Sequence, residues 1–341
     1  MKKLFLKDIA KNLNVSKTAV SLVLNDKGDE NKISQDTQQR IIAYAKKHNY
    51  VPNQLARGLS RGKTETIGLI IPNISDTFYS AIAGCVETRA MELGYTVIFS
   101  SSNESSEKES KLIKSMLNRQ VDGLIIASTQ ENQDEIKFLQ KSKFPLVLID
   151  RHYPEISTNY VVVDNFGGIY KATNHLLSLG RKKIGFVTIK SELEAMKQRL
   201  LGYQNAIGDS RGAQNELLVE FLQHTNFKNQ MEGAIKKLIL TENHTDALVF
   251  STHYLAHEGL RVLKSLNVKV PNDVAIASFA EMAAFDLVDP PITSVLQPVK
   301  EIGKTAVDIL VDEMKDEKMI EQPHKKKVLE TSFVIRKSCG S

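Results

Sequence analysis

Residues 7–25 read KDIAKNLNVSKTAVSLVLN, and this stretch decides how the first part of the chain folds. Near its start, apolar residues recur at positions i, i+3, i+4 and i+7, which predicts one apolar face on a short helix. They are Leu6, Ile9, Ala10 and Leu13. After a turn at residues 14–15, Ser16 is placed to cap a second helix over residues 17–24, because its hydroxyl accepts a bond from a free amide. The pattern favours a helix-turn-helix, whose second helix enters the major groove of DNA, over an unrelated hairpin of helices.

A third helix is predicted after Ser34, another capping residue. It should end before Pro52, because proline disfavours helical backbone at the residue preceding it. Packed on the first two helices, it would complete a small three-helix core. The residues expected to face that core are Ile41, Ile42, Ala45 and His48.

Residues 53–60, NQLARGLS, suit a helix of only two turns, which is too short to be stable alone in water. If two copies become ordered on DNA, Leu55 and Leu59 are neighbours at i, i+4. One leucine would pack against the dimer mate while the other enters a base step from the minor groove and kinks the duplex. The alternative is a plain linker with incidental leucines.

The distribution of charge agrees with a DNA-binding head. The chain of 341 residues has a net charge of +5, yet residues 1–63 hold 13 Lys and Arg against 5 Asp and Glu. The positive excess therefore lies in the part expected to meet phosphates. Two cysteines, Cys85 and Cys339, exclude a disulfide framework. With no signal peptide and no apolar run of about 20 residues, a cytoplasmic protein without a membrane partner is expected.

Beyond Lys63 the chain alternates β-branched runs with helical patterns, which predicts parallel sheets built of βαβ units. Strands are expected at residues 66–71, 96–100, 123–127, 146–149, 160–163, 183–188, 217–221, 247–251 and 274–278. Helices are expected at residues 78–93, 107–119, 168–179, 227–240 and 255–266. Two such sets indicate two doubly wound α/β subdomains, with a ligand cleft beyond the carboxyl ends of the strands.

The run from residue 6 to residue 25, followed by Y-x-P-N-x-L-A-R-x-L from Tyr50, resembles the LacI/GalR family of bacterial regulators. The resemblance continues through VDGLIIAS, HLLSLGRKKIGFV, RLLGY and PPITSVLQPVKEIGKTAV and covers essentially the whole chain. It implies that Lys17 and Thr18 read bases, that Ser16 and Ser21 hold phosphates, and that Leu59 is the wedge. The full implied DNA-contacting set is Ser16, Lys17, Thr18, Ser21, Leu22, Asn25, Asn53, Leu55, Ala56, Arg57 and Leu59.

For the rest of the chain the resemblance implies a body like the periplasmic sugar-binding proteins, with the chain crossing three times between two halves. The expected domains are a helix-turn-helix head (1–52), a hinge helix (53–63) and an effector-binding and dimerisation body (64–341). The first half of the body would be residues 64–163 and 294–322, and the second half residues 164–293 and 323–341.

Candidate effector-binding residues follow predicted strands or occupy positions that the family uses. They are Phe78, Tyr79, Asp150, Arg151, Arg199, His253, Tyr254, Ala280 and Gln297. Structural alternatives remain for several of them. Phe78 would then be core, Asp150 and Arg151 would pair with each other, and Arg199 would brace a loop.

Two positions depart from sugar-responsive relatives. Ala280 stands where an acidic residue is common, and His253-Tyr254 stands where an Asn-Asp pair is common. A sugar without a carboxylate partner for its hydroxyls loses about 1–3 kcal/mol of binding energy. Either the effector is not a simple hexose, or Glu281 supplies the carboxylate from a shifted loop.

Nothing in the sequence indicates catalysis, a metal site or a cofactor. Gly208-Asp-Ser-Arg-Gly212 matches G-x-S-x-G, but a helical segment precedes it where a nucleophile elbow needs a strand. We therefore expect a dimeric repressor that binds a near-palindromic operator and responds to a carbohydrate-related effector. The alternative, a sugar-uptake binding protein, would need a signal peptide and would lack the basic head.

Overall fold

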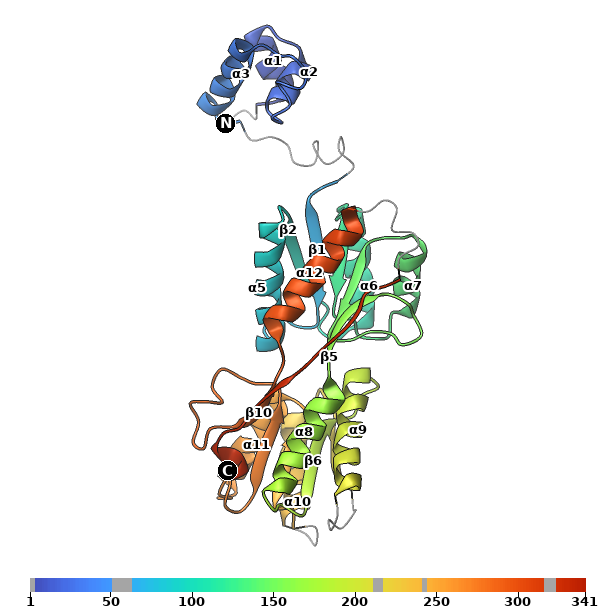
Figure 1. The fold of residues 1–341 in the computed structure, drawn as a ribbon, viewed down its shortest axis with the longest axis vertical. Coiled ribbons are helices and arrows are strands. Elements are labelled where there is room, and N and C mark those ends of the chain that lie inside the picture. The colour runs from blue at the N-terminus through green and yellow to red at the C-terminus, as the bar shows by residue number, and fades with distance from the viewer. Residues whose placement is uncertain (1–3, 51–62, 211–216, 241–243, 316–322) are drawn as a thin grey trace. The chain divides into compact units, whose positions relative to one another are not determined.

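The computed structural model describes residues 4–50, 63–210, 217–240, 244–315 and 323–341, which belong to two compact units (Figure 1). Residues 1–64 form the first unit, here called the head, and residues 65–341 form the second, here called the body. Within the described residues, no helix is long and apolar enough to cross a membrane.

The described part of the head folds into helices α1 (Leu6–Leu13), α2 (Lys17–Val23) and α3 (Gln35–Lys47). Asn14 takes the left-handed conformation, with φ 53°, and turns the chain between α1 and α2. The predicted caps are confirmed, because Ser16 Oγ accepts a bond from Ala19 N at 3.0 Å and Ser34 Oγ accepts one from Thr37 N at 3.4 Å.

The core of the head agrees only in part with the prediction. Its buried members are Ile9, Ala10, Val20, Val23, Ile41 and Ala45. The predictions for Ile42 and His48 were wrong, since Ile42 is 50% exposed and His48 lies at the exposed end of α3. Each helical residue is rotated by about 100° from the one before it, so the residue after buried Ile41 points outwards. Tyr44 and Tyr50 pack against the core instead.

The first lobe of the body contains a doubly wound sheet. In the described residues this sheet has six strands in the order β11-β5-β4-β3-β1-β2. The strands are β1 (Thr66–Ile71), β2 (Thr96–Ser101), β3 (Gly123–Ile126), β4 (Leu146–Ile149), β5 (Asn159–Val163) and β11 (Lys326–Leu329). Helices α5 (Thr77–Glu92) and α12 (Val299–Lys315) cover one face, and α6 (Ser106–Asn118) and α7 (Gln133–Lys141) cover the other (Figure 1).

The second lobe repeats this arrangement. Its described residues form six strands in the order β12-β10-β9-β8-β6-β7. The strands are β6 (Ile184–Ile189), β7 (Leu218–Leu222), β8 (Ala247–Phe250), β9 (Ala275–Phe279), β10 (Thr293–Leu296) and β12 (Ser332–Val334). Helices α8 (Asn165–Ser178) and α9 (Glu194–Asp209) lie on one face, α10 (Phe227–Ile239) and α11 (His253–Ser265) lie on the other, and η2 (Lys337–Cys339) follows β12.

The chain crosses between the lobes three times, but two crossings differ from the predicted boundaries. Residues 294–296 belong to β10, which pairs with β9 in the second lobe, and β11 pairs with β5 in the first lobe. The crossings therefore follow Leu296 and Leu329, not residues 293 and 322. β11 reads KKVL and is largely exposed at a sheet edge, so it lacks the buried apolar run that marks an inner strand.

The fold class is confirmed. Each of the nine predicted strands is present to within about two residues. Most of them are inner parallel strands, which are buried on both faces and read as apolar runs. Along β1, Ile67, Leu69 and Ile71 contact the core under α5 and α12, whereas Ile70 contacts the core under α6. Polar residues that follow strands of the two sheets meet at the junction between the lobes, as Gln130 after β3 does with Glu194 after β6.

Candidate functional site

The start of α2 presents polar side chains to solvent. Ser16, Lys17 and Thr18 are exposed, and Ser21 and Leu22 are half-buried one turn further on. Positions three and four residues apart share a helix face, so Lys17 and Thr18 lie next to Ser21 and Leu22 at the capped end of α2. This surface has the composition and position that a major-groove reader needs.

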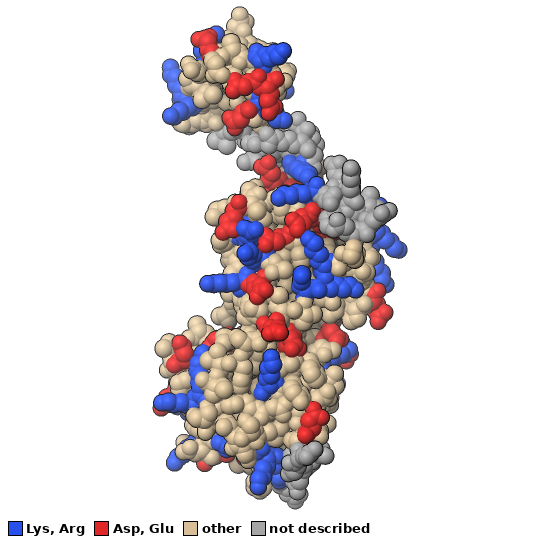
Figure 2. All heavy atoms as spheres, in the orientation of Figure 1, with Lys and Arg blue, Asp and Glu red and all other residues tan. Residues whose placement is uncertain are grey.

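One residue of the predicted DNA interface is engaged within the head, and the predicted hinge is not described by the structure. Asn25 folds back on its own helix, since its Nδ2 donates to Ser21 O at 2.6 Å. The predicted hinge residues lie outside the described residues. They are Asn53, Leu55, Ala56, Arg57 and Leu59. Figure 2 shows that acidic as well as basic side chains reach the surface of the head on the face drawn, so this face is not uniformly basic.

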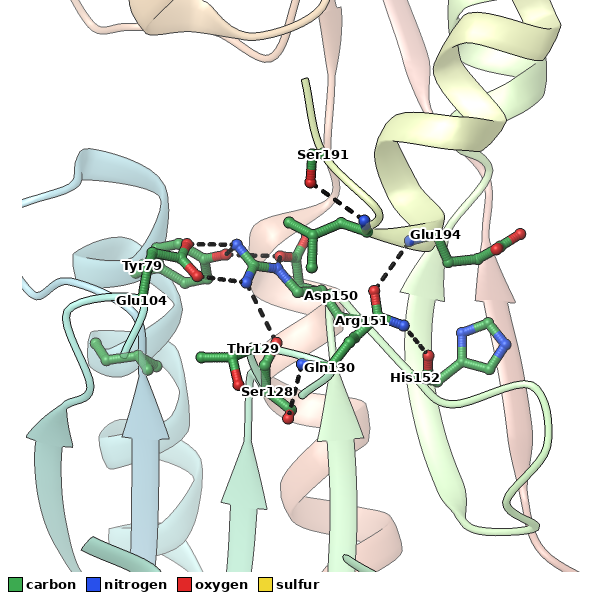
Figure 3. A network of polar contacts seen from close by, with 12 residues as sticks. Tyr79, Glu104, Ser128, Thr129, Gln130, Asp150, Arg151, His152, Ser191 and Glu194 are labelled. Atoms are coloured by element: carbon green, nitrogen blue, oxygen red, sulfur yellow. Dashed lines mark hydrogen bonds and ion pairs between the residues drawn. The ribbon is translucent and has the colours of Figure 1, made fainter. Parts of the chain in front are cut away.

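In the body, Asp150 and Tyr79 meet at the end of β4 (Figure 3). Tyr79, on the first turn of α5, donates its hydroxyl proton to Asp150 Oδ2 at 2.6 Å, and both side chains are buried. Burial raises the pKa of Tyr79 well above its ordinary value, so the hydroxyl remains a donor. Among the described residues, no donor reaches the second carboxylate oxygen, Oδ1 of Asp150, which leaves one acceptor uncommitted.

The guanidinium of Arg151 contacts four neighbouring residues. Its Nη2 and Nη1 donate to Glu104 Oε1 and Oε2 at 2.6 and 2.7 Å, and also to Tyr79 Oη and Ser128 O, both at 3.2 Å. Its Nε lies 3.3 Å from Asp150 Oδ2. Burial raises the pKa of Glu104, but the bonds and charge of Arg151 outweigh it and hold that pKa below its ordinary value. In this conformation Arg151 braces the site, since its donors are engaged by the protein.

Arg199 lies on α9 in the second lobe and is 5% exposed. Its Nε donates to Asn165 Oδ1 at 2.8 Å and its Nη1 donates to Ser251 O at 2.9 Å. The guanidinium stands 3.8 Å from the centre of the Phe279 ring, a cation–π geometry. Burial lowers the pKa of Arg199 to about 10, so the side chain is still charged at neutral pH. No described residue accepts a bond from its Nη2.

The close packing of α9 on α8 brings Arg199 to Asn165. Gly202, in the predicted RLLGY motif, makes this approach possible, because a Cβ there would collide with Phe166 O. Tyr203 secures the same helix to the sheet, donating its hydroxyl proton to Ile184 O at 2.8 Å.

Several buried polar atoms have no hydrogen-bond partner among the described residues. Among the described residues, the buried side-chain oxygens without a hydrogen bond belong to Thr158, Thr188, Ser251 and Gln297. Thr188 and Ser251 follow Val187 and Phe250, which are paired in register on β6 and β8 and contact the core on the α10 and α11 face. Because side chains alternate, Thr188 and Ser251 point to the opposite face, where α9 carries Arg199. Gln297 follows β10, so three of these oxygens lie at the carboxyl end of the second sheet.

His253 links the two lobes. Its Nε2 lies 3.6 Å from Oδ2 of Asp76, whose other oxygen caps α5 by accepting from Phe78 N at 2.8 Å. Burial lowers the pKa of His253, so the ring is neutral at neutral pH. Tyr254 packs its ring 5.2 Å from Phe227, and Phe78 packs 5.1 Å from Tyr79. Aromatic rings therefore line both sides of the junction.

Ala280 occupies in the second lobe the place that Asp150 occupies in the first. Both follow the equivalent strand of their sheet, both have positive φ (66° and 63°), and both amides donate to the neighbouring strand. Of these two equivalent positions, only the one in the first lobe carries a carboxylate. Glu281 does not replace it, because its side chain forms an ion pair with Arg336.

Sequence reasoning missed Glu104, Asp76 and Gln130. Gln130 accepts a bond from Glu194 N across the junction at 2.9 Å and donates to His152 O (Figure 3). Glu104 and Gln130 both follow strands, β2 and β3, and that position is the signal that would have identified them. No three His, Cys, Asp or Glu side chains come together as a metal-binding group in the described part of the chain.

Comparison with known proteins adds independent findings. Residues 5–53 match the model described as bacterial regulatory proteins, lacI family, and residues 173–339 match a periplasmic binding protein-like domain. The chain is 30% identical to the HTH-type transcriptional regulator DegA of Bacillus subtilis (strain 168) over 299 residues, which are 87% of each chain.

Solved structures agree on the fold. The lac repressor dimer bound to operator and the anti-inducer ONPF superposes with a TM-score of 0.86 at 21% identity, covering 100% of both chains. A complex of the transcriptional regulator CelR with cellobiose gives a TM-score of 0.70 at 25% identity, covering 98% of this chain and 99% of that one.

Proposed function

This chain belongs to the lacI family of bacterial regulatory proteins, and we propose that a small molecule bound between the lobes of its body controls its binding to operator DNA. The protein is a helix-turn-helix transcriptional regulator and not an enzyme. The lac repressor in the structure compared above is a dimer bound to operator, and two copies of this chain related by a two-fold axis would suit a near-palindromic site.

On the DNA side, we assign base reading to Lys17 and Thr18 and phosphate contacts to Ser16 and Ser21. The support is the exposed, capped start of α2. Leu22 would contact a thymine methyl group, because an apolar side chain cannot hydrogen-bond to a base edge. We assign the minor-groove wedge to Leu59, and its test is whether Leu59→Ala reduces both operator affinity and DNA bending in a permutation assay.

The observation that carries the effector site is the set of uncommitted polar atoms around Arg199. Native interiors leave few buried polar groups without a partner. Here the buried hydroxyls of Thr188 and Ser251 and the amide oxygen of Gln297 have no partner among the described residues, and the backbone oxygen of Ser251 accepts a bond from Arg199 Nη1. A ligand that supplies hydrogen bonds to these groups would offset their burial.

The chemistry of the junction favours a neutral polyhydroxylated ligand. Asp150 Oδ1 offers an acceptor from the first lobe and Arg199 Nη2 offers a donor from the second. A sugar hydroxyl is both donor and acceptor, so it satisfies either group. Aromatic rings such as Phe78 and Tyr254 provide faces for the apolar side of a sugar. These features support a carbohydrate-related effector that is larger than a simple hexose, or one whose binding depends less on acidic side chains.

We propose that the effector changes how the lobes close. Lobe closure would in turn change how the hinges of the two subunits, residues 53–63 of each, bind the DNA. A ligand shifts such an equilibrium only by its difference in affinity for the two arrangements. The ordering of residues 53–63 on DNA would then be the step that the effector favours or opposes.

The test is a thermal-shift screen of the full chain against sugars, sugar acids and nucleosides, repeated with Arg199→Met. A saturating ligand at about 100 times its Kd adds about 2.7 kcal/mol, which raises Tm by about 5 °C or more. Arg199→Met should abolish the shift. Arg181→Met is the matched control, since Arg181 also donates to backbone carbonyls, of Asp246 and Pro271, in the second lobe. A shift that survives in Arg199→Met would refute the site.

A further inference from the structure

Helix α9, which carries Arg199, begins without a capping side chain of its own. Its N-cap residue is Leu193, which has no side-chain acceptor. By contrast α5, α8 and α11 are capped by the side chains of Asp76, Asp164 and Thr252. The first amides of any helix have no acceptor within the helix, so an uncapped start is a weak point.

Gln130 of the first lobe supplies the missing acceptor. Its Oε1 accepts a hydrogen bond from Glu194 N, the first amide of α9, at 2.9 Å, while its Nε2 donates to His152 O. The second bond orients the amide, because only the oxygen end can accept from the helix and only the nitrogen end can donate to a carbonyl.

The loop that carries Gln130 is anchored by a buried carboxylate. Glu109, fully buried, accepts bonds from Ser128 Oγ and Thr129 N, both at 2.7 Å, and from Asn132 Nδ2 at 3.0 Å. Ser128 Oγ in turn accepts from Gln130 N at 3.2 Å. Gln130 is therefore held by its own lobe, and its bond to α9 forms only when the second lobe is close.

We infer that Gln130 is a positioning residue that caps α9 from the opposite lobe, so that lobe closure and the ordering of the first turn of α9 are one event. Arg199 lies five residues beyond Glu194 on the same helix, about 7.5 Å along its axis. Opening the lobes uncaps the helix that positions Arg199. The capping itself requires no ligand, whereas its consequence for an effector rests on the proposed function.

The experiment is amide hydrogen exchange on the full chain without any added ligand. A lost cap costs about 1 kcal/mol, which is about fivefold in an opening equilibrium. Gln130→Leu keeps the volume and removes both polar groups, so exchange at residues 194–197 should accelerate about fivefold. Gln140→Leu is the matched control, because Gln140 also donates to a backbone carbonyl, Ser157 O, but lies within the first lobe.

Two further substitutions at Gln130 distinguish capping of α9 from general support of the first lobe. Gln130→Glu keeps an acceptor for Glu194 N but loses the bond to His152 O, so it should restore part of the protection at residues 194–197, whereas Gln130→Lys offers only a donor and should restore none. Unchanged exchange in Gln130→Leu would overturn the inference. So would faster exchange throughout the first lobe without a selective effect on α9. If exchange at residues 194–197 accelerates in Gln130→Leu as expected, but no compound in the thermal-shift screen raises the Tm of the wild-type chain, the result counts against the proposed function alone.

Discussion

Replacing Glu104 by Gln should destabilise the body, because it leaves the buried guanidinium of Arg151 with half of its counter-charge. The two bonds between them are 2.6 and 2.7 Å long, and the side chains of Arg151 and Glu104 are 8% and 32% exposed. Breaking a fully buried pair costs about 3–5 kcal/mol. Asp150 remains 3.3 Å from Nε of Arg151, and Glu104 is partly solvated. We therefore expect Glu104→Gln to lower the free energy of unfolding by about 1–2 kcal/mol.

The loss should depend on pH in a defined direction. Since Arg151 holds the pKa of Glu104 below the ordinary value of 4.5, the carboxylate stabilises the folded protein above that pH. The contribution declines as pH falls through the lower, folded-state pKa. The difference in unfolding free energy between wild type and Glu104→Gln should therefore be constant from pH 6 to 7 and shrink below about pH 4.5.

Urea unfolding followed by circular dichroism measures both effects. Glu107→Gln is the control, because the Glu107–Lys111 pair is equally short, at 2.6 Å, but its side chains are 80% and 72% exposed, and it should change nothing measurable. Arg151→Met combined with Glu104→Gln should cost less than the sum of the single changes. Equal stability of Glu104→Gln and wild type at pH 7, or a difference independent of pH, would refute the reasoning.

Further predictions concern the head and the α8–α9 contact. Ser16→Ala removes the cap of α2 and should lower the stability of the head by about 1 kcal/mol, seen as a lower Tm of its transition in calorimetry. Lys17→Ala should relax the sequence preference measured with operator variants. Lys27→Ala should not, because Lys27 is exposed beyond the end of α2. An equal loss of affinity for all operator variants in Lys17→Ala would make Lys17 a phosphate contact. Gly202→Ala should destabilise by about 1–3 kcal/mol in urea, although Ala favours helix, because of the clash with Phe166 O; a stabilised variant would contradict this.

The sequence predicted what depends on local patterns. Ser16 and Ser34 cap helices in the positions expected of them, and the inner strands among the nine predicted appear as buried apolar runs. The errors come from elements whose pattern is weak. β11 is an exposed edge strand containing Lys326 and Lys327, and Ile42 lies on the solvent side of α3, which composition alone does not reveal.

The candidate site was predictable as a set of positions but not as a set of roles. Asp150 and Arg199 could be named because they follow a strand or match a family motif. Whether a donor is free depends on partners far away in the chain. Glu104, which lies 47 residues before Arg151, accepts bonds from both terminal nitrogens of the Arg151 guanidinium. The cap of α9 by Gln130 likewise joins residues 64 apart.

Local sequence alone determined the helix-turn-helix, the caps and the alternating strands and helices, because hydrogen bonds and apolar faces within a few residues specify them. The tertiary structure alone decided which polar groups at the junction are already satisfied and which remain open. The reason is physical: a buried charge or amide is defined by the atoms around it, and chain topology brings those atoms together from distant segments.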